Sequence, residues 1–118
     1  MSKIIFTAFI CFLGFNLSGQ DLTPNYWHTG EENTIIETYQ KDGKWFGKII
    51  SSDNEKAKIG KDILQGFEKV DGEWTGQLFA AKRGRLVDAV IVPTNQSLEI
   101  TVSAGIIKKQ LTWKKHDQ

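Results

Sequence analysis

Apolar and polar side chains alternate along most of the chain, and this alternation predicts β-strands. Leu98, Ile100 and Val102 share one face of a segment whose intervening positions are polar. A repeat of two residues places successive side chains on opposite faces of a half-buried strand. Leu111 and Trp113 follow the same pattern nearer the end of the chain. The sequence therefore predicts an all-β fold.

Two segments share the pattern D-G-x-W-x-G-x-[IL], one beginning at Asp42 and the other at Asp71. An Asp-Gly pair between alternating runs is a strong hairpin signal, because a type I′ turn needs positive φ at both central residues. We expect Trp45 and Trp74 to begin the return strands on the inner face. The glycine two residues after each tryptophan then lets a strand bend or a large neighbour approach closely.

The predicted strands are short and joined by tight turns. They cover residues 25–29, 34–40, 44–51, 63–69, 73–81, 85–92, 97–103 and 108–115. Eight such strands in succession predict an antiparallel up-and-down barrel. Residues 53–62 form the one polar stretch long enough for an extended loop, and no helix is predicted after residue 20.

The first residues of the chain predict an export signal. Lys3 precedes a 12-residue, mostly apolar run at positions 4–15, and small and polar residues follow the run. A membrane-spanning helix needs about 20 residues, whereas this arrangement is typical of a secretory signal peptide. We predict cleavage near Gly19, giving an exported single domain of residues 20–118 with no stable membrane span. An uncleaved anchor is the alternative.

Charge and cysteine content narrow the function classes. The chain has 15 basic and 14 acidic residues, a net charge of +1, so it is not predicted to bind nucleic acid through its phosphates. Cys11 is the single cysteine and falls in the apolar run, which excludes a disulfide and thiol chemistry from the mature domain. Acidic residues dominate up to Glu55 and basic residues from Lys56 on. In a closed barrel these halves would face each other across one small molecule.

No motif for catalysis or for a metal ion stands out. His28 and His116 are the two histidines, and neither has an acid or cysteine at a metal-ligand spacing. There is no nucleophile elbow and no phosphate-binding loop. The sequence predicts no enzyme, no metal and no cofactor, and it carries no signal for an oligomeric state.

The sequence predicts the positions of a few charged residues, inside the barrel or at its turns. Glu37 and Asp88 each lie within an apolar alternation, so they are candidate inward charges; the alternative is that both face water. Glu31 and Glu32 are adjacent, so on an extended segment they would point to opposite sides; we predict that they form a solvated turn before the second strand. Residues 82–85 are the densest basic cluster and predict a solvated hairpin tip, with an anion or lipid-headgroup contact as the alternative.

An ordered set of short motifs resembles the bacterial DUF2147 proteins, which are small exported domains of uncharacterised function. The set is Tyr26-Trp27, Tyr39, Gly47-Lys48-Ile49, Leu64-Gln65-Gly66-Phe67, Trp74-Thr75-Gly76, Gly105-Ile106 and Thr112-Trp113. The resemblance implies a lipocalin-like barrel and no known reaction. The chain departs from the family in a shorter middle loop at residues 53–62, and in Phe79-Ala80-Ala81 where Tyr-Asp-Pro is usual.

The leading functional hypothesis is a non-enzymatic barrel that binds a small apolar or amphipathic molecule. An eight-stranded barrel either fills with side chains or holds one ligand. The predicted apolar walls are Trp27, Trp45, Phe67, Trp74 and Trp113, with Tyr39 as a polar handle. The alternative is an interaction or structural module with a filled core, and a metal-free hydrolase is a third hypothesis. The volume of the interior cavity distinguishes the ligand-binding barrel from the module with a filled core.

Overall fold

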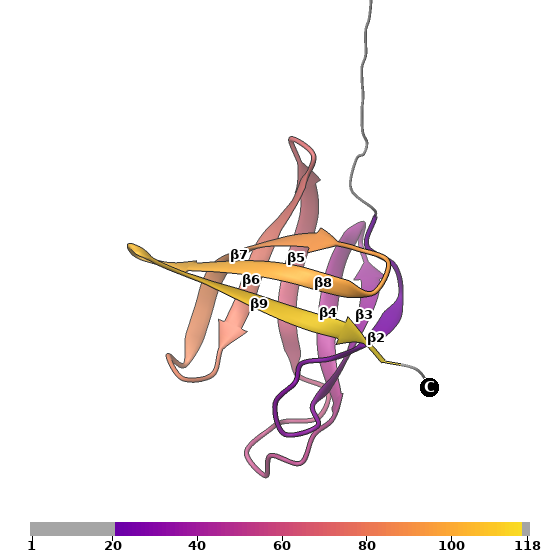
Figure 1. Ribbon diagram of the computed structural model, residues 1–118, viewed down its shortest axis with the longest axis vertical. Helices are drawn as coiled ribbons and strands as arrows, with labels where there is room; N and C mark the ends of the chain where they lie inside the picture. The colour runs from indigo at the N-terminus through magenta and orange to yellow at the C-terminus, as the bar shows by residue number, and fades with distance from the viewer. Residues whose placement is uncertain (1–20, 117–118) are drawn as a thin grey trace, which may run out of the picture.

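The computed structural model describes residues 21–116; the predicted signal peptide, residues 1–19, lies outside this range with its cleavage site. The strands are β2 (Asn25–His28), β3 (Ile35–Lys41), β4 (Lys44–Ser51), β5 (Asp62–Val70), β6 (Glu73–Ala80), β7 (Arg85–Pro93), β8 (Ser97–Ala104) and β9 (Ile107–Lys115). Each strand pairs antiparallel with the next, and β9 pairs with β2 to close the barrel (Figure 1). The prediction of an all-β, eight-stranded, lipocalin-like barrel is confirmed.

The up-and-down order gives the barrel two distinct ends. The β3–β4, β5–β6 and β7–β8 turns lie at one end, here called the closed end, and the other four connections lie at the opposite, open end. Leu22, on the segment before β2, is buried in the same core as Trp27 and Leu98. This segment therefore helps to cover the closed end.

Both predicted Asp-Gly hairpins form at the closed end. Asp42 and Gly43 have φ values of 53° and 79°, and Asp71 and Gly72 have values of 52° and 84°. Positive φ at both central residues is the type I′ conformation, whose twist matches that of the flanking strands. The tryptophans that follow these turns point inward, as predicted: Trp45 is buried and Trp74 packs against the core.

The two strand glycines allow neighbouring side chains to lie against the backbone. A Cβ added at Gly76 would lie 2.7 Å from two ring carbons of Phe67, and one at Gly47 would lie 2.9 Å from Leu64 Cδ1. Phe67 is turned onto Gly76 by a bulge in β5, where Gly66 adopts a φ of 67°. The predicted close approach to these glycines is therefore present at both positions.

Thr38 is the polar centre of the closed end. Its hydroxyl is buried and accepts hydrogen bonds from Trp27 Nε1 at 2.9 Å and from the Asn25 amide at 3.1 Å. It donates to the Thr23 carbonyl at 2.7 Å. One hydroxyl thus fixes the ring of Trp27 and ties the segment before β2 to β3.

We expect Thr38→Val to destabilise the barrel, because it keeps the side-chain shape but leaves these partners without their hydroxyl. A buried donor or acceptor that loses its partner costs about 1–3 kcal/mol. Thr38→Ser keeps the hydroxyl and should cost less, so the two variants separate hydrogen bonding from packing. Chemical unfolding monitored by tryptophan fluorescence measures both. Equal losses for valine and serine would contradict the role of the hydroxyl.

Candidate functional site

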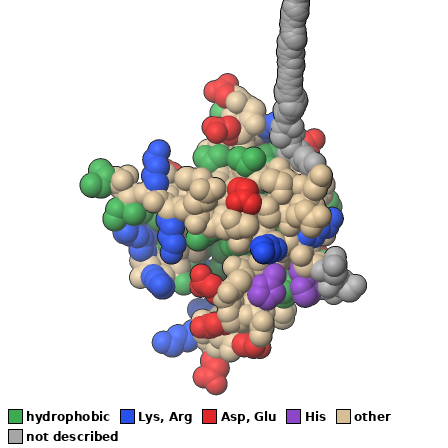
Figure 2. Space-filling model, in the orientation of Figure 1, with side chains coloured by type: hydrophobic (Ala, Val, Ile, Leu, Met, Phe, Trp, Pro, Cys, Tyr) green, Lys and Arg blue, Asp and Glu red, His purple; other side chains and the backbone are tan. Residues whose placement is uncertain are grey.

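An apolar cavity of about 510 Å³ occupies the open half of the barrel. Inward-facing side chains from six strands form much of its wall: Ile36, Ile49, Leu78, Val87, Val102 and Trp113. Volumes of about 300–1,000 Å³ are usual for sites that hold a small organic molecule. Figure 2 shows the hollow where the cavity reaches the surface. The described barrel therefore has an aromatic core at its closed end and an open space at the other.

The cavity mouth carries opposite charges on its two sides. Glu31 and Glu32 line it from the β2–β3 loop, whereas Lys82 and Arg83 line it from the β6–β7 turn and Lys109 from β9. In Figure 2, basic side chains gather to the left of the hollow and acidic side chains below it. The uneven distribution of charge along the sequence thus becomes a polarised rim around an apolar interior.

Both glutamates line the cavity because the backbone is not extended there. Glu32 and Asn33 have φ values of 51° and 50°, in the left-handed region. The solvated turn predicted for Glu31 and Glu32 is present: both residues are exposed and lie in the turn before β3. The Glu32 carbonyl accepts a hydrogen bond from the Asp53 amide at 2.8 Å, and Asn33 Nδ2 donates to Asp53 Oδ2 at 2.6 Å. The acidic side of the rim is thereby joined to the β4–β5 loop.

The structure places the predicted wall residues at different heights in the barrel. Trp113 lines the cavity, and its Cα partner on β8 is the core residue Leu98. Trp45 and Phe67 are buried in the core, and Trp74 packs against it. The indole N–H of Trp74 is buried with no hydrogen-bond partner among the described residues. Of the five predicted aromatic walls, Trp113 is the one that contacts the large cavity.

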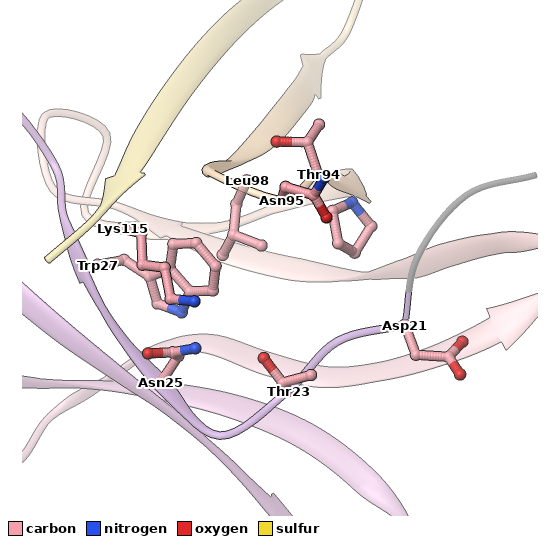
Figure 3. A pocket seen from close by; sticks show the side chains of 9 residues that line it. Asp21, Thr23, Asn25, Trp27, Thr94, Asn95, Leu98 and Lys115 are labelled. Carbon is pink, nitrogen blue, oxygen red and sulfur yellow. The ribbon is translucent and has the colours of Figure 1, made fainter. Parts of the chain in front are cut away.

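Trp27 lines a second, smaller pocket at the closed end, of about 160 Å³. The pocket lies between the segment before β2 and the β7–β8 turn (Figure 3). Thr23, Asn25, Thr94 and Lys115 contribute polar atoms to its lining. It is smaller than usual small-molecule sites, so it is a weaker candidate than the open cavity.

Tyr39 lies on the outer wall, not in the cavity, which corrects its assignment as the polar handle. Its ring stacks on Phe46 with centroids 5.8 Å apart, and its hydroxyl donates to Asp62 Oδ1 at 2.6 Å. Its sequence neighbour Thr38 takes the inward position instead. Glu37, also on the outer wall, pairs with Lys48 at 3.8 Å. The polar residue that faces inward on β3 is therefore Thr38, through its hydroxyl group.

Asp88 is exposed on β7 between the buried residues Val87 and Ala89. Glu37 and Asp88 were candidate inward charges, and the structure places both on the outer surface. In each strand the apolar or hydroxyl neighbours occupy the core-facing positions, because a buried carboxylate needs a compensating partner.

Burial raises the pKa of Tyr39 from 10.0 to about 12, and its hydrogen bond to Asp62 and the charges of Asp62 and Glu37 act in the same direction. A pKa that is higher in the folded state means that the fold favours the protonated phenol. We expect this stabilisation to be complete below pH 10 and to be lost as the pH rises from 10 towards 12. Unfolding free energies measured across this window test the effect. Tyr39→Phe should flatten the pH dependence of the unfolding free energy, whereas the control Tyr26→Phe should leave it unchanged. The same slope in the wild type and in both variants would contradict the role of Tyr39.

The described part of the chain holds no cluster of metal ligands and no membrane-spanning helix. Among residues 21–116 no three His, Cys, Asp or Glu side chains lie close enough together to hold a metal ion. His28 and His116 come together with ring centroids 6.2 Å apart, and His28 Nδ1 accepts a hydrogen bond from the Gly30 amide at 2.9 Å. No helix that could cross a membrane occurs in the described range.

Comparisons with family models, with curated proteins and with solved structures find no match to this chain. The resemblance to the DUF2147 proteins therefore stays a prediction. The geometry of the cavity is what supports a functional proposal.

Proposed function

We propose that this protein is a non-enzymatic, exported barrel that binds a small amphipathic molecule in its open-end cavity. The observation that carries the proposal is a cavity of about 510 Å³ with an apolar wall and a charged mouth. An apolar body gains free energy by leaving water for such a wall. Its polar end can stay at the mouth, close to solvent and to charged side chains. The sequence of the first 19 residues supports export.

The position of the cavity predicts how the ligand lies. Its interior is bounded by Trp113 and Leu78, below which the aromatic core leaves no comparable space among the described residues. The apolar part must therefore enter from the mouth and stop at this level. Lys82, Arg83 and Lys109 would meet a negative group, and Glu31 and Glu32 a positive one. A zwitterionic or an anionic end suits this rim better than an uncharged one.

A chain-length series tests the proposal directly. Saturated fatty acids of increasing length compete with a fluorescent apolar probe for the purified protein. Each buried methylene contributes about 0.8 kcal/mol, so affinity should rise by up to about fourfold per methylene and stop rising once the cavity is full. Amines and zwitterions with the same chain report on the charge preference of the rim. Absence of probe binding with every chain length would overturn the proposal and favour a module that acts through its outer surface.

Native mass spectrometry of the protein recovered from the exported fraction examines cargo and processing together. The expected spectrum contains a chain that begins near Gln20 and carries an extra mass, which is lost on denaturation and recovered in an organic extract. A bare chain that also fails to take up fatty acids would contradict ligand binding. A chain that keeps residues 1–19 would contradict signal cleavage and leave the ligand question to the competition assay.

A further inference from the structure

The tip of the β8–β9 hairpin exposes two consecutive aliphatic side chains. Ile106 is fully exposed (101%), and Ile107 is 58% exposed. Gly105, with a φ of 67°, makes the reversal. This hairpin reaches far from the barrel axis in Figure 1, and its tip carries a green, apolar end in Figure 2. Single exposed aliphatic residues are common on protein surfaces, but a pair at a protruding tip leaves a large apolar area in water.

Basic residues surround this tip. Lys108 and Lys109 follow the two isoleucines, and residues 82–85 add Lys82, Arg83 and Arg85 on the β6–β7 hairpin, which belongs to the same end of the barrel. The β7–β8 pairing ends at Asp88 and Ser103, and beyond it Lys82 and Arg83 line the same cavity mouth as Ile107 and Lys109. Figure 2 shows several Lys and Arg side chains grouped behind the apolar tip.

The tips of the two hairpins carry no acidic residue. Neither residues 81–87 nor residues 103–111 contain an aspartate or glutamate. In the part of the chain that the structure describes, the ion pairs are those of Lys44, Lys48 and Lys69, so none of the five basic side chains at these hairpins is neutralised by one. Five positive charges and two exposed isoleucines therefore share one surface, the hairpin-tip surface.

We propose that the hairpin-tip surface docks on an anionic lipid membrane, with Ile106 and Ile107 entering the interface and the basic residues meeting lipid phosphates. Aliphatic side chains flanked by lysine and arginine are suited to the boundary between headgroups and acyl chains. Each basic residue near an anionic bilayer strengthens binding about fivefold. A narrow, convex tip buries little area against the surface of a folded partner, whereas lipid can close around it. A membrane is therefore favoured over an acidic protein.

Docking in this way would turn the cavity mouth towards the membrane. Ala104, Ile107, Lys82, Arg83 and Lys109 belong to the two hairpins and also line the cavity. A lipid-derived molecule could then pass between bilayer and cavity without crossing open water. The docking proposal goes beyond ligand binding and does not depend on it, because Ile106, Lys108 and Arg85 do not line the cavity.

Co-sedimentation with vesicles tests the proposal on the purified protein. We expect binding to vesicles of phosphatidylcholine with phosphatidylglycerol, weak binding to phosphatidylcholine alone, and loss of binding at high salt. Ile106→Asp should reduce vesicle affinity at least tenfold, because it places a charge in the interface. Val70→Asp is the matched control, since Val70 is a 52% exposed aliphatic residue at the closed end. It should bind like the wild type.

An Ile106→Trp variant separates insertion from simple electrostatic attraction. On vesicle binding its emission should shift to shorter wavelength relative to the wild type, and lipid-borne quenchers should reduce it. Insertion would be overturned if Ile106→Asp bound the vesicles as tightly as the wild type does. It would also be overturned if the protein bound soluble polyglutamate as tightly as it binds vesicles, because the surface would then be only a basic patch for an acidic polymer. No affinity for anionic vesicles would overturn docking altogether, while the fatty-acid competition would still report on the cavity.

Discussion

Replacing Gly76 with alanine is expected to destabilise the barrel strongly, and more than the same change at Gly47. Both glycines face inward on strands, and neither has a positive φ. The new methyl group at position 76 would lie 2.7 Å from two ring carbons of Phe67 and 2.9 Å from the carbonyl oxygen of Gln65. Phe67 is completely buried, and a backbone carbonyl in a paired strand has little room to move. The clash can be relieved only by shifting β5 against β6.

The contacts at Gly47 are of another kind. An added Cβ there would meet Leu64 Cδ1 at 2.9 Å and Leu64 Cγ and Ile36 Cγ2 at 3.0 Å, which are all side-chain atoms and not backbone. Side chains can move to relieve such contacts more readily than a paired backbone carbonyl can. Overpacking a core costs about 1–3 kcal/mol, and we expect Gly47→Ala near the lower limit and Gly76→Ala at or above the upper one.

Urea unfolding of the two variants measures the difference. A double-mutant cycle with Phe67→Leu identifies the ring as the cause, because the smaller side chain should recover part of the loss at Gly76 and none at Gly47. Equal costs at the two glycines, or no coupling between Gly76→Ala and Phe67→Leu, would contradict the close approach of Phe67 to the β6 backbone. Thr75→Ala, at the neighbouring outward position, controls for changes in strand propensity.

The strands and their inward faces were predictable because they depend on local signals. Alternation assigned Leu98, Ile100 and Val102 to the core side, and the Asp-Gly turns placed Trp45 and Trp74 inward. These features need only the period of a strand and the φ preference of a type I′ turn. The bulge that turns Phe67 onto Gly76 is harder to predict, since Gly66 alone does not show where one extra residue enters the ladder.

The cavity was predicted only in outline because alternation gives the face of a residue and not its height along the barrel. Trp45 lies two residues after Gly43 of a closed-end turn, so it had to lie at that end, far from the mouth. The residues that leave the open half unfilled are small or of moderate size, such as Val87, Val102 and Ala104. Short inward side chains near the open-end hairpins were the available signal. The most prominent aromatic residues, Trp45, Phe67 and Trp74, lie in or against the core and do not line the cavity.

Tyr39 and Glu37 show a second limit of the same reasoning. Both stand among apolar residues in the sequence, yet the inward position between them belongs to Thr38. The reason is a long-range contact: the Thr38 hydroxyl accepts a hydrogen bond from Trp27 Nε1, and its buried site is polar because of this partner. Pattern alone cannot identify such a pair, since the two residues lie on different strands.

Filling the cavity should abolish ligand binding without unfolding the barrel, and Val102→Trp is the sharpest test. Val102 faces the cavity from β8, and the indole would enter space that the wild-type side chains leave open. We therefore expect at least a tenfold loss of affinity for the fluorescent probe and for fatty acids. The free energy of unfolding should change by less than about 1.5 kcal/mol, because a larger side chain that meets open space causes little of the strain seen in filled cores.

Thr101→Trp provides the control for this experiment. Thr101 precedes Val102 on β8 and faces the outer surface, so the same indole is added without reducing the cavity. It should bind the probe like the wild type. Unfolding curves for both variants establish that each is folded before binding is compared. If Val102→Trp is folded and still binds with wild-type affinity, the ligand does not occupy the cavity. The binding site would then lie on the outer surface, because a folded barrel with a filled interior can contact a ligand only through its exterior.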